Sequence, residues 1–200
     1  MKYTELAIEG TLLVTPDVLA DERGRFLEEF NSGSFEAHTG RTLPVAQLNL
    51  SVSHLGAVRG MHSYVLPGQC YYMICVQGAV LDVVLDIRVG SPTFGEHVAV
   101  TLDADRHQAM YVAEGLAHGF APLTDGATIV YLATSLWRPG TQFGINPLDP
   151  RLGLPWPRHA GRDPLLSEKD RTAPSLAEAR ERGMLPSYAD CRRIYRAASA

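Results

Sequence analysis

The chain has 200 residues, of which 46% are hydrophobic and 20% are charged, and its formal net charge is −4. This length is typical of one domain, and the apolar content is sufficient for a packed core. The acidic balance excludes an extended basic surface for nucleic acid or an anionic membrane, and the N-terminus lacks the apolar core of a signal peptide. We therefore expect a cytoplasmic protein with no nucleic-acid or membrane partner.

Three cysteines, Cys70, Cys75 and Cys191, have no spacing typical of a metal site. Their odd number fits a reducing compartment better than a framework of disulfides. We expect three free thiols that are buried as small hydrophobic side chains.

The segment VAQLNLSVS, residues 45–53, alternates strictly between apolar and polar side chains. A period of two indicates a strand with one apolar and one polar face. Alternation alone favours a polar face turned toward water. The alternative is a barrel wide enough for a ligand, because Gln47 and Asn49 would then point inside and hydrogen-bond a polar molecule.

Further short β-patterned segments follow, separated by Pro-Gly, Gln-Gly and Asp-Gly signals. Residues 56–78, GAVRGMHSYVLPGQCYYMICVQG, are typical of two strands joined by a turn. The pair QCYYMICV and AVLDVVLDIR, and the pair AMYVAEGLAHGFAPL and ATIVYLAT, each predict a β-hairpin. The regular spacing predicts an all-β domain, either a sandwich or a small barrel.

Helical character is confined mainly to the C-terminal part. PSLAEARERG places Pro174 near the start of a helix and Gly183 at its end. Residues 187–200 are expected to form a second short helix or a frayed tail. We accordingly divide the chain into a β domain, residues 1–176, and a helical tail, residues 177–200.

Two isolated histidines, His62 and His118, are candidates for chemistry, although a lone histidine is more often a hydrogen-bonded structural residue. Metal sites in barrels of this kind usually contain a His-x-His pair, because three or four donors must converge on one ion. At the corresponding position the chain reads His62-Ser63-Tyr64. The second ligand is absent, and we expect no metal.

Six segments resemble, in this order and spacing, the dTDP-4-dehydrorhamnose 3,5-epimerase family: DERGRFLEEF, VRGMH, VLDVVLDIRVGSPTFG, YVAEGLAHGF, VYLAT and LDPRLGLPWP. The resemblance covers residues 5–176. It implies an all-β fold, a cupin-like jelly-roll barrel with short C-terminal helices, that forms a homodimer and uses no cofactor. The family exchanges N-terminal segments between subunits, which would place DERGRF beside the partner's pocket.

The resemblance also implies the reaction, which is epimerisation of a dTDP-4-keto-6-deoxyhexose at C3, C5 or both, in deoxysugar biosynthesis. The C4 ketone acidifies the neighbouring carbons, so that a base can form an enolate and an acid on the opposite face can return the proton. By resemblance His62 is the base, Asp170 orients it and Tyr131 is the acid. Asp170 has a second interpretation, because Ser167 to Asp170 form a capping-box pattern that would only begin a helix.

Substrate-binding roles follow from the same resemblance. Arginine suits the diphosphate because its planar fork can hold two phosphate oxygens at once. The remaining candidates would contact the nucleotide or the sugar, with an aromatic residue for stacking or shielding. The candidates are Arg23, Phe26, Glu28, Gln47, Asn49, Arg59, His118 and Trp137.

Tyr71 is the point at which the chain departs from the family. The family segment after the histidine usually reads GQAKYV, and its lysine is thought to help stabilise the enolate oxygen, whereas this chain has GQCYYM. Tyr71 occupies the lysine position, and alternation places it on the face opposite Tyr72. We expect the phenol of Tyr71 to take over this catalytic role, as tyrosine does in other enolising sites, with Tyr72 as the alternative donor if the alignment is shifted by one residue.

The lost lysine leaves two alternatives to an epimerase. One is a sugar-nucleotide 3,4-ketoisomerase, which also needs an enolate but moves the carbonyl. The other is a nucleotide-sugar binding protein without catalysis. Retention of His62, Tyr131 and Asp170 argues against the second alternative, because a binding module needs no acid and base.

Overall fold

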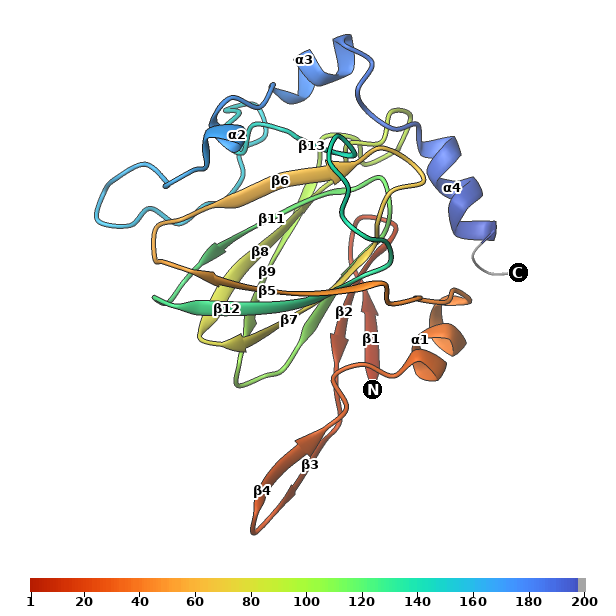
Figure 1. The fold of residues 1–200 in the computed structure, drawn as a ribbon, viewed down its shortest axis with the longest axis vertical. Helices are drawn as coiled ribbons and strands as arrows, with labels where there is room; N and C mark the ends of the chain where they lie inside the picture. The colour runs from red at the N-terminus through yellow and green to blue at the C-terminus, as the bar shows by residue number, and fades with distance from the viewer. Residues whose placement is uncertain (198–200) are drawn as a thin grey trace.

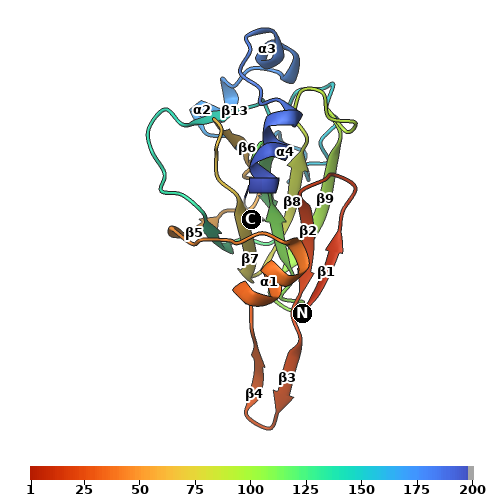
Figure 2. The ribbon, with the colours of Figure 1, turned by 90° about the vertical axis from the view of Figure 1, so that its right-hand side faces the viewer.

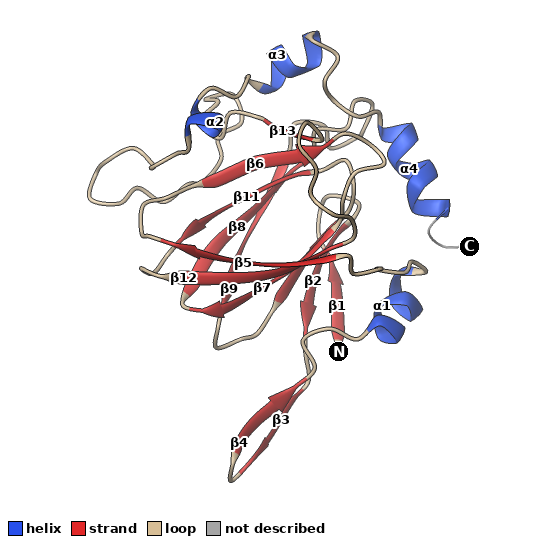
Figure 3. Cartoon of the chain, viewed as in Figure 1, coloured by secondary structure: helices blue, strands red, loops and turns tan. Residues whose placement is uncertain are grey.

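The computed structural model describes residues 1–197, which form two antiparallel β-sheets, a projecting two-stranded hairpin and four short helices (Figure 1). The strands are β1 Lys2–Glu5, β2 Thr11–Thr15, β3 Val18–Asp21, β4 Gly24–Leu27, β5 Gln47–Ser53, β6 Arg59–Tyr64, β7 Tyr71–Gln77, β8 Ala79–Leu85, β9 His97–Asp103, β10 Ala109–Val112, β11 Ala117–Pro122, β12 Ala127–Ala133 and β13 Gln142–Gly144. The helices are α1 Ser32–Thr39, α2 Glu168–Arg171, α3 Leu176–Glu181 and α4 Tyr188–Ala197. The predicted all-β class is confirmed (Figure 3).

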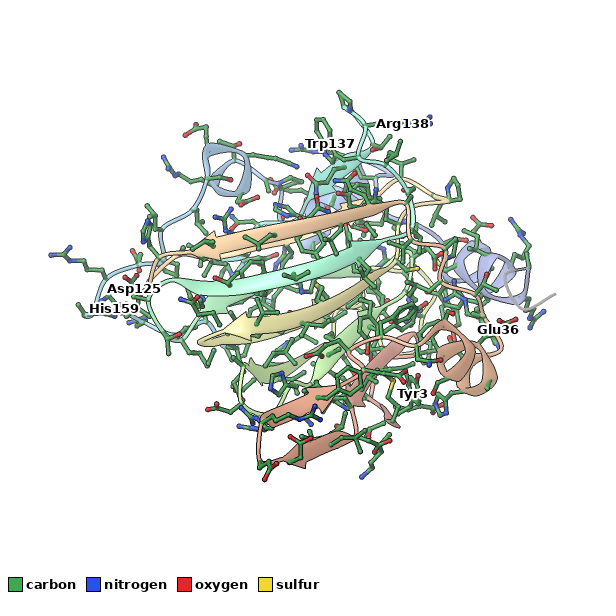
Figure 4. The ribbon with its side chains drawn as sticks, turned by 60° about the horizontal axis from the view of Figure 1, so that its bottom comes forward. Tyr3, Glu36, Asp125, Trp137, Arg138 and His159 are labelled. Atoms are coloured by element: carbon green, nitrogen blue, oxygen red, sulfur yellow. The ribbon has the colours of Figure 1, made fainter. Side chains whose placement is uncertain are left out.

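The two large sheets have strand orders that interleave distant parts of the chain. The six-stranded sheet runs β1-β2-β10-β7-β12-β5, and the five-stranded sheet runs β13-β6-β11-β8-β9. Figure 4 looks onto the six-stranded sheet, with β5 at its edge. These crossing connections are those of a jelly roll, in which the two sheets pack face to face around the interior of the barrel.

The predicted hairpins are wrong in their pairing. The strands β7 and β8 are separated only by Gly78, yet β7 pairs with β10 and β12 while β8 pairs with β9 and β11. The strands β11 and β12 likewise lie in different sheets, as do β6 and β7. Turn residues mark where a strand ends, but the partner of each strand is selected by burial across the whole barrel.

Alternate residues of the strands fill the space between the sheets. The main core cluster joins Met73 and Cys75 of β7 with Val84 of β8 and Phe120 of β11, and Ile129 of β12 packs against them. The same inward faces continue to Tyr71 and Tyr131, which are only partly buried. The apolar core therefore gives way to an open cavity farther along these strands.

The C-terminal helices pack on the β domain. Leu176 and Ala179 of α3 belong to the same buried cluster as Met61, Val83 and Leu85 of the five-stranded sheet. The helix α3 is capped by Ser175 and is followed by Gly183 in a left-handed conformation. Residues 188–197 form the second predicted helix, and the expected tail beyond it lies outside the described residues.

The segment DIRVGSPTFG has a structural role. Arg88 is fully buried, and its guanidinium donates to both carboxylate oxygens of Asp86 at 2.9 and 2.7 Å. Ser91 and Thr93 donate to the same carboxylate, and Arg88 also donates to the hydroxyl of Tyr195 in α4. Each charge is paired and hydrogen-bonded, so this cluster anchors the C-terminal helix to the sheet.

The hairpin of β3 and β4 projects away from the sheets (Figure 2). It exposes three large apolar side chains, Val18, Leu19 and Phe26. No helix among residues 1–197 is long and apolar enough to cross a membrane. The three cysteines are free and buried, as expected.

Candidate active site

A cavity of about 710 Å³ opens between the two sheets at the end where the apolar core stops. Its walls come from β5, β7 and β12 of one sheet and from β6, β11 and β13 of the other, and α2 closes one side. This volume is typical of a small-ligand site. The polar groups described below converge on it.

His62 and Asp170 form a close pair on the cavity wall. The ring Nε2 of His62, on β6, lies 2.6 Å from Oδ1 of Asp170, on α2. Close approach of β6 and β11 supports this arrangement, because a Cβ at Gly60 would lie 2.5 Å from Cα of Gly119. Both strands therefore depend on glycine at this crossing, two residues before His62.

Both interpretations of Asp170 describe part of the structure. Ser167 caps α2 by accepting a hydrogen bond from the backbone NH of Asp170, while the carboxylate of Asp170 interacts with His62. Burial raises the pKa of Asp170, but hydrogen bonds from His62, Ser167 and the backbone of Gly60 outweigh it and hold the pKa below its usual value. The carboxylate is therefore charged at neutral pH and fixes the orientation of the imidazole.

Tyr131 and Tyr71 face the cavity from the opposite sheet. Their ring centroids are 5.7 Å apart in an edge-to-face arrangement, and the ring of Tyr71 lies 6.4 Å from that of His118. Burial raises the pKa of Tyr131 above its usual value, and the nearby Tyr64 adds to this effect. Tyr72 points to the other face, where its hydroxyl donates to the carbonyl of Glu29, so the predicted face of Tyr71 is confirmed.

His118 lies beside His62 in the register of β11 and β6. Its Nε2 is 2.8 Å from Oδ2 of Asp82, a fully buried carboxylate on β8. The neighbouring strand therefore holds the second imidazole at the cavity wall.

The polar face of β5 lines the cavity, which reverses the orientation favoured by alternation alone. The side-chain NH2 group of Gln47 donates to Oδ1 of Asn49 at 2.6 Å. The side-chain Oε1 of Gln47 accepts a hydrogen bond from the backbone NH of Trp137 at 2.9 Å. The apolar residues Leu48 and Leu50 are each 63% exposed on the outer face. The interior of the barrel beside β5 is a polar binding cavity. The polar side chains of this strand therefore face the cavity and not the solvent.

Arg59 and Trp137 line the cavity near opposite ends of β5. The guanidinium of Arg59 donates to the hydroxyl of Ser53 at 2.8 Å and to the carbonyl of Val52 at 3.1 Å. Trp137 lies in the loop after β12, at the opposite end of the strands from Asp125 and His159 (Figure 4). An arginine and an exposed aromatic ring thus stand where an anionic nucleotide could bind.

Comparison with known proteins assigns the fold and the cavity to a family. The chain matches the family model described as dTDP-4-dehydrorhamnose 3,5-epimerase over residues 5–178. The chain belongs to this family. It is therefore a sugar-nucleotide epimerase, an isomerase of deoxysugar biosynthesis.

Relatives and solved structures include both 3-epimerases and 3,5-epimerases. The epimerase is 48% identical over 184 residues to a dTDP-4-dehydro-6-deoxyglucose 3-epimerase of a Streptomyces species, which covers 92% of this chain and 93% of that protein. It is 43% identical over 195 residues to the dTDP-4-dehydrorhamnose 3,5-epimerase of Mycobacterium tuberculosis, covering 97% and 96%. A 3'-monoepimerase from Streptomyces bikiniensis, solved in complex with dTDP-quinovose, superimposes with a TM-score of 0.92 at 46% identity and covers 97% and 98% of the two chains.

Three predicted site residues of the epimerase lie outside its own cavity. Arg23, Phe26 and Glu28 are on or directly after the projecting hairpin, where Arg23 pairs with Asp21 at 2.6 Å. Phe26 is 66% exposed, and Glu28 accepts a hydrogen bond from Asn31. The structure does not bring these residues to the other candidates within one chain.

Sequence reasoning missed four residues that line the cavity of the epimerase. Tyr64 could have been found from period-two alternation, since it lies two residues after His62 on the same face of β6, and Gln69 lies two residues before Tyr71, just outside β7. Lys169 directly precedes Asp170 in α2. Gln142 of β13 carried no signal, because its approach to Tyr64 depends on the pairing of β13 with β6.

The metal prediction concerns the same wall of the epimerase. Within residues 1–197, no group of three or more His, Cys, Asp or Glu side chains is arranged to hold a metal ion. The histidines instead hold carboxylates by single hydrogen bonds.

Proposed function

We propose that this epimerase inverts C3 of a dTDP-4-keto-6-deoxyhexose, with His62 as the base and Tyr131 as the acid. The observation that supports the proposal is that His62 comes from the five-stranded sheet and Tyr131 from the six-stranded sheet, on opposite walls of one cavity. A sugar ring bound between them would have a proton acceptor on one face and a donor on the other. Inversion of a carbon requires this arrangement.

The reaction proceeds in two proton transfers. His62 takes the proton of C3, the electrons of the C–H bond form a double bond between C3 and C4, and the carbonyl electrons move to the C4 oxygen. Tyr131 then returns a proton to C3 from the other face, which restores the ketone. His62 releases its proton to solvent, and the Tyr131 phenolate is reprotonated from solvent.

Asp170 and Tyr71 support the charged states of this reaction. The Asp170 carboxylate lies 2.6 Å from the imidazole and favours the imidazolium that forms when His62 takes the proton. Tyr71 lies beside Tyr131, and its ring also approaches His118 of the other sheet; we assign the enolate oxygen to the tyrosine hydroxyls that line this part of the cavity. The sugar carbonyl would therefore point toward the tyrosines.

The nucleotide is bound at the mouth of the cavity. Arg59 is placed to bind the diphosphate, and Gln47 and Asn49 offer amide groups to the base or the sugar. His118 adds a polar contact, and Trp137 shields or stacks on the ligand. The monoepimerase structure with dTDP-quinovose shows that the same fold holds a dTDP-sugar in a relative.

A homodimer with exchanged N-terminal segments would complete the site. The β3–β4 hairpin projects with exposed apolar residues, which a single chain leaves uncovered. The outer face of β5 adds the exposed side chains of Leu48, Leu50 and Val52. We propose that the hairpin packs on a second chain and brings Arg23, Phe26 and Glu28 to the partner's cavity.

Light scattering tests the dimer directly. The expected mass corresponds to two chains of 21.8 kDa each. The variant Leu19→Asp should shift the population toward the monomer. Activity should fall in parallel, because the partner's hairpin completes each site. A fully active monomer would exclude this proposal.

Proton NMR in heavy water tests the activity. Incubation with dTDP-4-keto-6-deoxyglucose should lead to deuterium at C3, and the state of C5 decides between a 3-epimerase and a 3,5-epimerase. The comparisons do not support the ketoisomerase or the binding protein, and the same spectra would detect them, as a 3-keto product or as no exchange at all. Three free, buried thiols favour the reducing cytoplasm as the site of the reaction.

A further inference from the structure

Two short chains of hydrogen bonds meet at the cavity, where Tyr64 of β6 and Tyr71 of β7 approach each other. In the first, the amine of Lys169 donates to Oε1 of Gln142, and Nε2 of Gln142 donates to the hydroxyl of Tyr64 at 2.9 Å. In the second, the hydroxyl of Tyr71 donates to Oε1 of Gln69 at 3.0 Å, and Nε2 of Gln69 donates to the carbonyl of Ser135 at 2.7 Å. The rings of Tyr64 and Tyr71 meet edge to face with centroids 6.0 Å apart.

Lys169 and the carbonyl of Ser135, the outer members of the two chains, determine the direction of each hydrogen bond. An ammonium group can only donate, so Gln142 must turn its carbonyl to Lys169 and its NH2 group to Tyr64. A backbone carbonyl can only accept, so Gln69 must turn its NH2 group to Ser135 and its carbonyl to Tyr71. Neither amide can be reversed without placing two donors or two acceptors against each other.

This direction gives the two phenols different roles. Tyr71 uses its only proton on Gln69, whereas Tyr64 accepts a hydrogen bond from Gln142 and retains its own proton for donation. Burial raises the pKa of Tyr64 above its usual value, against hydrogen bonds with Tyr71 and Gln142, so Tyr64 stays protonated at neutral pH. Tyr64 is therefore the phenol of the pair that is free to donate.

Tyr64 is also placed next to the base. It lies two residues after His62 on β6, so both side chains project from the same face of the strand, about 6.6 Å apart along it. Gln142 lies directly opposite Tyr64 in the register of β13 and β6. A carbonyl adjacent to the carbon that His62 deprotonates would lie within reach of this hydroxyl.

We propose that Tyr64 is a further catalytic residue, which donates a hydrogen bond to the enolate oxygen, and that Gln142 and Lys169 are positioning residues that keep its proton available. The inference rests on the proposed epimerase function and identifies which tyrosine of the cavity is the donor. As negative charge develops on the substrate oxygen, the hydroxyl of Tyr64 donates a hydrogen bond to it.

Donation by Tyr64 is less costly than donation by Tyr71. If Tyr71 turned its proton to the substrate, the carbonyl of Gln69 would lose its donor inside the wall. If Tyr64 does so, it keeps the hydrogen bond that it accepts from Gln142. The charge of Lys169, conveyed through the Gln142 amide, also polarises the Tyr64 hydroxyl toward donation.

The variant Tyr64→Phe tests the proposal. It removes one hydroxyl and keeps the ring, so kcat for C3 exchange should fall by about tenfold to a hundredfold while KM stays within about threefold. Tyr71→Phe should lose less than Tyr64→Phe, because the donor remains. Tyr72→Phe is the matched control, since its hydroxyl lies on the opposite face of β7, and it should retain wild-type kcat.

Gln142→Glu provides the second test, which also serves if Tyr64→Phe does not fold. A carboxylate accepts from both Lys169 and Tyr64, so it would draw the proton of Tyr64 away from the substrate. The kcat should fall by about tenfold in the wild-type background, and by no more than about twofold when Tyr64→Phe is already present. Equal losses in both backgrounds would mean that Gln142 acts independently of Tyr64.

The outcomes separate this inference from the proposed function. Wild-type protein without exchange at C3 or C5 would overturn both. Wild-type exchange with unchanged kcat in Tyr64→Phe would overturn the role of Tyr64 and leave the epimerase intact. A larger loss in Tyr71→Phe than in Tyr64→Phe would instead assign the donor to Tyr71.

Discussion

The two histidine–aspartate pairs of this protein lie side by side on the five-stranded sheet but differ in their construction. His118 and Asp82 are on neighbouring strands, and their side chains are 11% and 0% exposed. His62 is held by Asp170 from α2, 108 residues farther along the chain, and the side chain of His62 is 28% exposed. One pair is built into the sheet, and the other is assembled at the cavity from separate elements.

This difference predicts different roles for the same pair of residue types. An imidazole with access to the cavity can exchange protons with substrate and solvent, as a base must. An imidazole enclosed by its own sheet keeps a constant position and suits the binding of a polar group. The following experiments test that division, from the largest expected effect to the smallest.

The variant His62→Ala should lower deuterium exchange by at least about a thousandfold, because it removes the imidazole that accepts the C3 proton. Binding of dTDP, measured by calorimetry, should stay within about tenfold of wild type, since most binding energy comes from the diphosphate and the base. Exchange at the wild-type rate would show that His62 is not the base.

The variant Asp170→Asn should lower kcat by about a hundredfold. It leaves the imidazole in place but removes the negative charge that stabilises the imidazolium. The NH2 group of asparagine can also donate to the imidazole, where the carboxylate could only accept. Thermal unfolding provides the control, because the backbone NH of Asp170 that Ser167 accepts from is retained and α2 should stay formed. A reduced Tm with unchanged kcat would indicate that the Asp170 carboxylate is only structural.

The variant His118→Ala should act mainly on binding. We expect KM to rise by about tenfold and kcat to stay within about threefold, because the enclosed imidazole contacts the substrate equally in the ground and transition states. Steady-state kinetics on the 4-keto substrate measures both quantities. If kcat fell as far as in His62→Ala, the two pairs would share the proton transfer and the comparison would fail.

Removal of metal should have no effect on either pair. Treatment with EDTA followed by gel filtration should leave activity within about twofold of the untreated enzyme, since both histidines are engaged by carboxylates. Elemental analysis of the same samples serves as the control. A stoichiometric transition metal whose loss abolishes turnover would contradict the proposed mechanism.

Local patterns in the sequence were sufficient for several features of the site. The alternation of β7 correctly separated Tyr71 from Tyr72, because side-chain direction in a strand depends only on a period of two. Ser167 marked the start of α2, because a cap acts within one turn. The resemblance of six segments to an epimerase family correctly indicated the fold and the reaction class.

Long-range pairing decided the rest. The strands β7 and β8 follow each other with one residue between them, yet they lie in different sheets because each buries its face against partners elsewhere in the chain. The polar face of β5 lies inward for the same reason, because the cavity is formed by several strands together and the sequence of β5 alone does not encode it. The contact of Asp170 with His62 and the approach of Gln142 to Tyr64 join residues 108 and 78 positions apart. The sequence determined the groups and their local faces, and the tertiary structure alone determined which of them meet, because that depends on the burial of the whole barrel.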